Sequence, residues 1–206
     1  MRRRLMMLKK SGGGLPEGYT AVNYLQSSGV QWIEMGVAPN QNTKAVLKIK
    51  INVFTDKGAS LIGSRTDGNL NDQFFTYLDY IGGTRFLFRM DGQPQAISWT
   101  GLTTDKIYTV TLSGTEMKAE LEDGTAVFSK TFSVSDFEST VTMELFKSKS
   151  FDYGFQGRIY SCKHYSGDEL IQDFVPCLDT GGVPCMFDLV SRKSFYNVGT
   201  GSFTWG

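Results

Sequence analysis

Apolar and polar side chains alternate with a period of two along several short segments of the chain. The clearest case is residues 43–54, where aliphatic residues alternate with lysine and asparagine. The aliphatic positions are Leu47, Ile49, Ile51 and Val53. Because successive side chains of a β-strand point to opposite faces of the sheet, this pattern predicts a half-buried strand.

Glycine turns separate these segments and predict hairpins. Residues 73–80 and 84–90 alternate on either side of Ile81-Gly82-Gly83, and residues 116–131 are interrupted at Asp123-Gly124, a pair that favours a two-residue turn. Further strands are expected at 106–112, 141–146, 157–165 and 170–175, with a last hairpin around Ser191-Arg192-Lys193. About a dozen short strands without a sustained helical period indicate an all-β sandwich or barrel.

The composition agrees with this fold class. The chain of 206 residues contains 23 Gly, 15 Phe and 9 Tyr but 5 Pro, and 40% of its residues are hydrophobic. Aromatic residues favour strands and glycines favour turns, and this length suits one large β domain with a substantial core.

The first 14 residues differ from the rest of the chain. They hold five of the 21 cations and no acid, and they end in Ser11-Gly12-Gly13-Gly14. A triple glycine is costly to order, so we expect a flexible basic tail over residues 1–14 and a single β-sandwich domain over residues 15–206. The remaining 16 cations face 21 acids, which gives no electrostatic basis for binding nucleic acid.

Export and redox signals are weak. The apolar stretch Leu5–Leu8 is shorter than the roughly 7–15 residues of a signal peptide core, and no run approaches the ~20 residues of a membrane helix, so we expect no membrane insertion. Cys162, Cys177 and Cys185 are odd in number, so at least one thiol stays free or pairs with another chain. A reducing site of folding is the simpler interpretation.

Both ends of the domain resemble a known fold family. Residues 15–40 and residues 157–203 together are similar to the terminal strands of concanavalin A-like (laminin-G-like) jelly rolls, which occur in phage tail and minor structural proteins and in bacterial surface proteins. The resemblance rests on Leu15-Pro16-Glu17-Gly18-Tyr19, Ser28-Gly29-Val30-Gln31-Trp32-Ile33, Gly157-Arg158-Ile159-Tyr160, Asp173-Phe174-Val175-Pro176-Cys177, Phe187-Asp188-Leu189-Val190 and Gly199-Thr200-Gly201-Ser202-Phe203. It implies a two-sheet antiparallel sandwich, and because it consists of turn and packing residues it does not fix the function.

Catalytic patterns are poorly represented. His164 is the only histidine and alternates with Tyr160 and Cys162, and no G-x-S-x-G elbow accompanies it. A histidine at a sheet edge or surface explains it. Glu120 and Glu122 share a face as a glycosidase pair would, but the E-x-D-x-x-E pattern of sandwich glucanases is absent. Solvent-facing acids beside a hairpin explain these two residues, and we expect no enzyme.

Two metal sites are conceivable. Cys162, His164, Cys177 and Cys185 have the ligand types of a Cys₃His zinc site, but their spacing lacks close cysteine pairs, and free thiols are favoured. Calcium is the stronger candidate, because the sequence from Asp67 to Asp72 begins like a D-x-N-x-N loop. The tentative ligands are Asp67, Asn69, Asn71 and Asp72. A polar turn between strands is the alternative.

Glycan binding requires exposed aromatic rings with nearby polar groups in a shallow site. Tyr77, Tyr80, Trp99 and Tyr153 lie in or beside turn-rich segments and are the tentative carbohydrate-binding residues, whereas Trp32 and Trp205 are expected to pack.

The leading hypothesis is a non-catalytic module of a phage or prophage particle that recognises host-surface carbohydrate, located in the virion or in the bacterial cytoplasm before lysis. A bacterial cell-surface lectin-like adhesion domain is the alternative, and a glycoside hydrolase is third. The expected partner is a cell-surface glycan or another structural protein, and homo-oligomers are compatible with exposed sheet edges.

Overall fold

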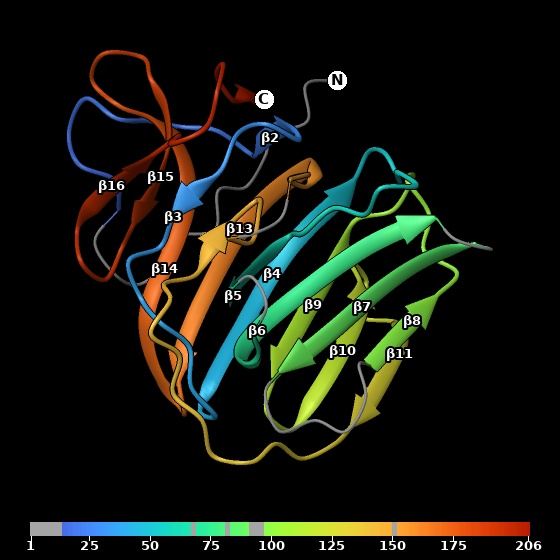
Figure 1. The fold of residues 1–206 in the computed structure, drawn as a ribbon. Helices are drawn as coiled ribbons and strands as arrows, with labels where there is room; N and C mark the ends of the chain where they lie inside the picture. The colour runs from blue at the N-terminus through green and yellow to red at the C-terminus, as the bar shows by residue number, and fades with distance from the viewer. Residues whose placement is uncertain (1–13, 67–68, 81–82, 91–96, 150–151) are drawn as a thin grey trace.

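The computed structural model of the chain describes residues 14–66, 69–80, 83–90, 97–149 and 152–206, and for Thr66 and residues 69–72 only the backbone (Figure 1). The secondary structure of these residues is strand and turn throughout. Within the described ranges, no segment forms a helix of the length and hydropathy needed to cross a membrane.

The larger sheet is an antiparallel path of eight strands with three short strands attached to it. Strand β2 pairs with β13 and β17, and β1 pairs with β14. In spatial order the path is β11 (Ala126–Thr131), β10 (Glu116–Leu121), β9 (Tyr108–Ser113), β4 (Thr43–Ile51), β13 (Gln156–Ser166), β14 (Glu169–Leu178), β15 (Pro184–Asp188) and β16 (Lys193–Tyr196). The attached strands are β1 (Thr20–Ala21), β2 (Leu25–Ser28) and β17 (Thr204–Trp205).

The smaller sheet has six antiparallel strands and lies against one face of the larger sheet (Figure 1). Its spatial order is β3 (Ile33–Glu34), β12 (Glu144–Leu145), β5 (Ile62–Thr66), β6 (Asn69–Tyr80), β7 (Thr84–Met90) and β8 (Ile97–Thr100). The two-sheet antiparallel sandwich that we expected is confirmed.

The main core fills the space between the sheets. From the larger sheet it takes the inward side chains of β4 and β9, and from the smaller sheet the phenylalanines of β6 and β7. Phe74 and Phe88 stack edge to face at 5.0 Å between ring centroids, and both are fully buried. Such aromatic pairs contribute about 0.5–1.5 kcal/mol beyond the area that they bury.

A second, smaller apolar cluster lies on the outer face of the larger sheet. It consists of Cys177, Cys185 and Phe187 on β14 and β15, covered by Leu15 and Tyr19 from the start of the domain. The Tyr19 ring meets the Phe187 ring at 5.5 Å, and its hydroxyl lies 3.0 Å from Ser194 Oγ. The first residues of the domain are therefore packed onto this face.

The three predicted hairpins are confirmed, the last of them by the pairing of β15 with β16 from Cys185↔Tyr196 to Asp188↔Lys193. Strands β6 and β7 pair from Phe74↔Met90 to Tyr80↔Thr84, although Ile81 and Gly82 lie outside the described residues. At the Asp123-Gly124 turn, the Leu121 amide donates to the Thr125 carbonyl at 2.9 Å, and Gly124 adopts φ 85°. Strands β10 and β11 pair across this turn.

Two local expectations were wrong. Val53 is 47% exposed and lies beyond the end of β4, so it does not extend the buried face of that strand. On β13, the register shifts between Ile159 and Ser161, which marks a β-bulge. The extra residue turns Tyr160 to the outer face while Cys162 and His164 point inward, so these three side chains do not share one face.

Candidate functional site

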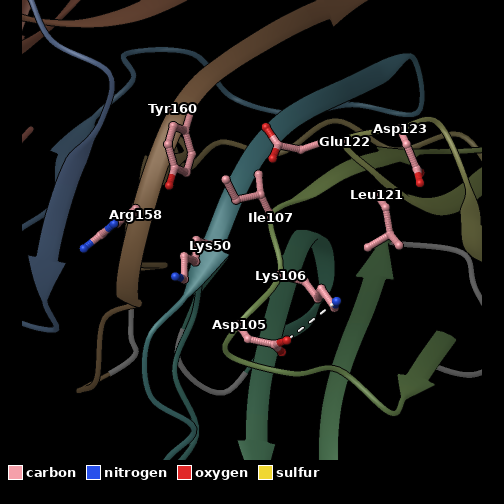
Figure 2. A pocket seen from close by; sticks show the side chains of 9 residues that line it. All are labelled: Lys50, Asp105, Lys106, Ile107, Leu121, Glu122, Asp123, Arg158 and Tyr160. Carbon is pink, nitrogen blue, oxygen red and sulfur yellow. Dashed lines mark ion pairs between the residues drawn. The ribbon is translucent and has the colours of Figure 1, made fainter. Parts of the chain in front are cut away.

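The outer face of the larger sheet has a hollow of about 460 Å³ where β4, β10 and β13 lie close to the loop before β9 (Figure 2). We call it the charged hollow. Its lining residues are Lys50, Asp105, Lys106, Ile107, Leu121, Glu122, Asp123, Arg158 and Tyr160. Its volume lies within the range of about 300–1,000 Å³ that is typical of small-molecule sites.

Strand alternation places the side chains of one wall. Lys50 occupies an outward position of β4, whose inward residues Ile49 and Ile51 are fully buried in the core. Arg158 is its direct cross-strand partner on β13, and Tyr160 follows beside the bulge. In Figure 2, the Tyr160 hydroxyl is turned toward Lys50 and Arg158. Because the core holds these strands, the wall is rigid.

Neutral neighbours hold Arg158 in position. Its Nε donates to Gln26 Oε1 at 2.8 Å, and its guanidinium carbon lies 4.3 Å from the centroid of the Tyr24 ring. The Tyr24 ring in turn meets the Tyr160 ring edge to face at 5.5 Å. Gln26 of β2 and the preceding Tyr24 thus support the wall from the neighbouring position in the same sheet.

Acidic residues line the other side of the hollow. Glu122 forms an ion pair with Lys48 at 2.7 Å, and Asp105 lies 3.7 Å from the Lys106 ammonium. Asp123 Oδ1 accepts the Thr125 amide at 2.9 Å, and this hydrogen bond is the main cause that lowers the pKa of Asp123. Asp123 is therefore a charged acceptor at neutral pH, suited to a hydroxyl group of a ligand.

A second hollow of about 410 Å³ lies on the outer face of the smaller sheet, and we call it the arginine hollow. It is lined by Arg65, Phe75, Tyr77, Arg85 and Leu87. Arg85 Nε donates to the fully buried Asp79 at 3.0 Å, and a second hydrogen bond joins the same two side chains. Phe75 is 8% exposed and lies beneath Arg65. The Phe75 ring is thus covered, whereas Tyr77 is half-buried.

Three of the four aromatic residues proposed from the sequence lie around residues 55–60. Tyr80 donates its amide to Thr55, the Tyr77 ring abuts Gly58, and the Tyr153 carbonyl accepts the Ser60 amide at 3.2 Å. Tyr80 is 58% exposed and Tyr153 39% exposed. The Lys57 ammonium lies 5.2 Å from the centroid of the Tyr153 ring, and a hydrogen bond to Tyr153 raises the pKa of Lys57.

Trp99 does not join these residues. It is 6% exposed, stacks on Phe128 at 5.8 Å and meets Tyr108 edge to face at 5.3 Å. A ring covered in this way cannot stack on a sugar, so the structure excludes Trp99 as an exposed binding residue. Trp205, expected to pack, is instead 51% exposed, whereas Trp32 packs partly against the core.

The calcium site proposed over residues 67–72 stays a prediction. Asp67 lies outside the described residues, and Asn69, Asn71 and Asp72 belong to the backbone of strand β6, where Asn69 pairs with Thr66. Among the residues that the structure describes, no three His, Cys, Asp or Glu side chains are grouped to hold a metal ion.

The histidine and the cysteines are separated by the sheet. His164 is 1% exposed, so it is a core residue and not, as we expected, an edge or surface one. Its Nδ1 donates to Gln172 Oε1 at 3.1 Å, and Gln172 Nε2 donates to the Met35 carbonyl at 2.9 Å. Burial lowers the pKa of His164. Cys162 faces the same core, whereas Cys177 and Cys185 belong to the outer cluster.

The two glutamates considered for glycosidase chemistry are engaged with lysines. Glu120 pairs with Lys118 at 2.7 Å, and Glu122 pairs with Lys48 at the same distance. Both lie on the outer face of the larger sheet, which confirms that they face solvent. Sequence reasoning noted Glu122 and Tyr160 but not the hollow they share, because its walls come from residues about 100 positions apart in the chain.

Neither protein-family models nor curated protein sequences give a match to the chain. Several solved structures match it in fold. A proposed carbohydrate-binding protein from Bacteroides ovatus superposes over 91% of this chain with a TM-score of 0.60 and 14% identity, and this chain spans 60% of that protein's length. The mouse laminin alpha1 LG4-5 domains align with a TM-score of 0.46, 13% identity, and coverage of 84% of this chain and 49% of that chain. A heptameric SAP-like pentraxin from Limulus polyphemus aligns with a TM-score of 0.45, 14% identity, and coverage of 74% and 76%.

These similarities concern the fold. The order of the strands in two antiparallel sheets and the superposition on the Bacteroides protein show a jelly-roll sandwich, the fold that the concanavalin A-like resemblance implies. The resemblance noted in the sequence is confirmed at this level.

Proposed function

We propose that this chain is a non-catalytic glycan-binding module and that the charged hollow is its binding site. The observation that carries the proposal is the set of side chains in the hollow: a half-buried tyrosine beside Lys50 and Arg158 on strands anchored in the core, and carboxylates on the loop before β9 and the turn after β10. A sugar ring offers an apolar face to an aromatic side chain and hydroxyl groups to charged hydrogen-bonding partners.

The Bacteroides protein with this fold supports the same class of function, since it is described as carbohydrate-binding. Fold alone does not assign a ligand, so the argument rests on the hollow. The ion pairs of Glu120 and Glu122 with lysines favour a binding role over glycosidase chemistry, in which a carboxylic acid must be free to give up and take back a proton.

The test is a glycan-array screen with the full chain, repeated with calcium and with a chelator. Tyr160→Ala should abolish the binding that the wild type shows. Tyr165→Ala is the matched control, because Tyr165 lies on the outer face of the same strand but does not line the hollow. Binding that survives Tyr160→Ala and is lost in Leu87→Lys would move the site to the arginine hollow. A chain that binds no glycan would refute the proposal.

At a finer level, we place the module in a phage or prophage particle, where it would recognise host-surface carbohydrate. The sequence resemblance supports this placement. Mass spectrometry of particles purified by density gradient from an induced producer strain should find the chain in the particle fraction. Recovery from the cell envelope of uninduced bacteria would support instead the alternative of a cell-surface adhesion domain.

A further inference from the structure

The charged hollow contains an uncompensated pair of positive charges. Lys50 and Arg158 are direct cross-strand partners on the outer face of β4 and β13. Like charges placed directly opposite on a sheet destabilise it. Three other lysines on this face have acidic partners, namely Lys48 with Glu122, Lys118 with Glu120 and Lys163 with Asp173. Within the described part of the chain, neither Lys50 nor Arg158 forms an ion pair.

The Arg158 guanidinium is also held ready for a ligand. Its Nε donates to the neutral Gln26 and its guanidinium carbon lies over the Tyr24 ring, so both of these contacts leave its positive charge without a counter-charge. A planar guanidinium binds carboxylate in a bidentate manner, and an ordered guanidinium loses less entropy when it binds. In Figure 2, Lys50 and Arg158 lie together on one side of the hollow, away from Leu121 and Asp123.

We propose that the glycan bound here is acidic and that its anionic group lies between Lys50 and Arg158. This inference rests on the proposed function, since it names the ligand class of the same hollow. The opposite side carries the carboxylates of Glu122 and Asp123, which would repel a densely charged polyanion. The hollow therefore selects a saccharide with one localised anionic group, with neutral hydroxyls facing the acidic side.

The experiment uses a glycan array in which each acidic saccharide is printed beside its neutral parent. The pairs are sialyllactose and lactose, an oligosaccharide with a single galacturonate residue and its carboxyl-reduced form, and monosulfated lactose and lactose. The wild-type chain should bind acidic members at least tenfold more tightly than their parents. Arg158→Gln and Lys50→Gln should each remove this preference. Lys44→Gln is the matched control, because Lys44 is on the same face of β4 about 20 Å from Lys50.

The outcomes separate the two levels of the proposal. Equal binding to acidic and neutral partners, or a preference that persists in Arg158→Gln, overturns the acidic ligand but keeps the glycan-binding function. Binding of the sulfated and not the carboxylated saccharides identifies sulfate as the anionic group. A wild-type chain that binds nothing on the array overturns both.

A second inference comes from a different part of the molecule. Cys177 and Cys185 are direct cross-strand partners on β14 and β15, and their sulfurs are 3.5 Å apart. Directly opposed residues of antiparallel strands have Cα atoms about 4.5–5.5 Å apart, within the range of about 4.4–6.8 Å that a disulfide requires. Only a small rotation of the side chains separates this pair from a bond.

The start of the domain covers the two thiols. Both cysteines are fully buried, with Leu15 and Tyr19 packed against them, and Ala21 is the backbone partner of Cys177. The hydrogen bond between the sulfurs lowers the pKa of Cys185 and raises the pKa of Cys177, because the thiol that keeps its proton donates to the other sulfur. The thiolate is the attacking species in disulfide exchange.

We infer that Cys177 and Cys185 form a disulfide when a small-molecule disulfide reaches them, and that the segment 14–21 controls this access. With glutathione disulfide, Cys185 attacks one glutathione sulfur and releases the first glutathione. Cys177 then attacks the mixed disulfide and releases the second. The two cysteine sulfurs lose two electrons, and their two protons leave with the two glutathione thiols.

The test incubates the full chain with glutathione disulfide and follows its intact mass. We expect the loss of two hydrogen masses, a fall from three free thiols to one, and a cross-linked peptide that joins Cys177 to Cys185. Tyr19→Ala should speed the reaction at least tenfold, whereas Tyr165→Ala, outside the cover, should not change it. A bond to Cys162, or three thiols that persist in both the wild type and Tyr19→Ala, would refute the inference.

Discussion

The fully buried carboxylate of Asp188 organises the turn after β15. Its Oδ1 accepts the amide of Asp173 at 2.7 Å and that of Val190 at 3.1 Å. Its Oδ2 accepts the amide of Ser191 at 3.1 Å. One side chain therefore satisfies three backbone donors from two segments, so its removal should measurably destabilise the domain.

The exposure of the three backbone donors determines how much free energy of unfolding is lost in Asp188→Ala. Asp173 is 7% exposed, and its amide would be left without a partner in Asp188→Ala, at a cost of about 1–3 kcal/mol. Val190 and Ser191 are exposed, so water can replace the carboxylate and each bond contributes about 0.5–1.5 kcal/mol. The expected loss in the free energy of unfolding is about 3–4 kcal/mol.

Asp188→Asn separates the contributions of the two oxygens. The amide oxygen can keep both bonds made by Oδ1, whereas the new NH₂ group faces the Ser191 amide donor to donor. We expect a loss of about 1–2 kcal/mol, less than half of that in Asp188→Ala.

Urea unfolding followed by tryptophan fluorescence measures both variants. With a slope of about 2 kcal/mol per molar, Asp188→Ala should lower the midpoint by about 1.5–2 M. A shift below about 0.5 M in Asp188→Ala, or an equal shift in both variants, would show that the three bonds do not stabilise the turn as argued.

Three further predictions concern stability. Glu144 lies opposite another glutamate, and burial raises its pKa above the usual value of 4.5, so its ionisation weakens folding as the pH rises through and above 4.5. Glu144→Gln should therefore raise the urea midpoint more at pH 7 than at pH 4, and equal changes at the two pH values would contradict this. Gly58→Ala should lower the free energy of unfolding by more than about 2 kcal/mol, because a Cβ there would lie 2.0 Å from the Tyr77 ring. Gly36 has a similar positive φ but open space around it, so Gly36→Ala should lower the free energy of unfolding by about 1 kcal/mol in the same urea titration. Similar costs for the two alanine variants would rule out the clash. Deletion of residues 1–14 should leave the thermal midpoint unchanged, and a fall of several degrees would mean that the tail packs on the domain.

Much of the fold follows from local pattern. Alternation identified β4, and glycine turns identified the β6–β7 and β10–β11 hairpins, because both signals come from neighbouring residues. The hydrophobic pattern cannot show which strands pair across long distances. It gave no sign that β4 would lie between β9 and β13.

The site was less predictable for two physical reasons. A β-bulge leaves no fixed sequence signature, so Tyr160 was assigned to the face of Cys162 and His164 although it lines the charged hollow. Trp99 is of a residue type that is common in binding sites, yet it is covered by Phe128, which lies on a distant strand. The sequence predicts that Lys50 points outward from its strand, but it cannot show that Arg158 lies directly opposite.

The position of β4 has a consequence for the synthesis of the chain. Its neighbour β9 begins at Tyr108, about 60 residues beyond the end of β4, and its other neighbour β13 begins at Gln156, about 100 residues beyond it. At a synthesis rate of about 5–20 residues per second, the edge of β4 that pairs with β13 stays unpaired for on the order of 5–20 s. Unpaired edges promote aggregation, and lysines on an edge strand oppose it. The lysines at positions 44, 48 and 50 should therefore protect the nascent chain during this interval.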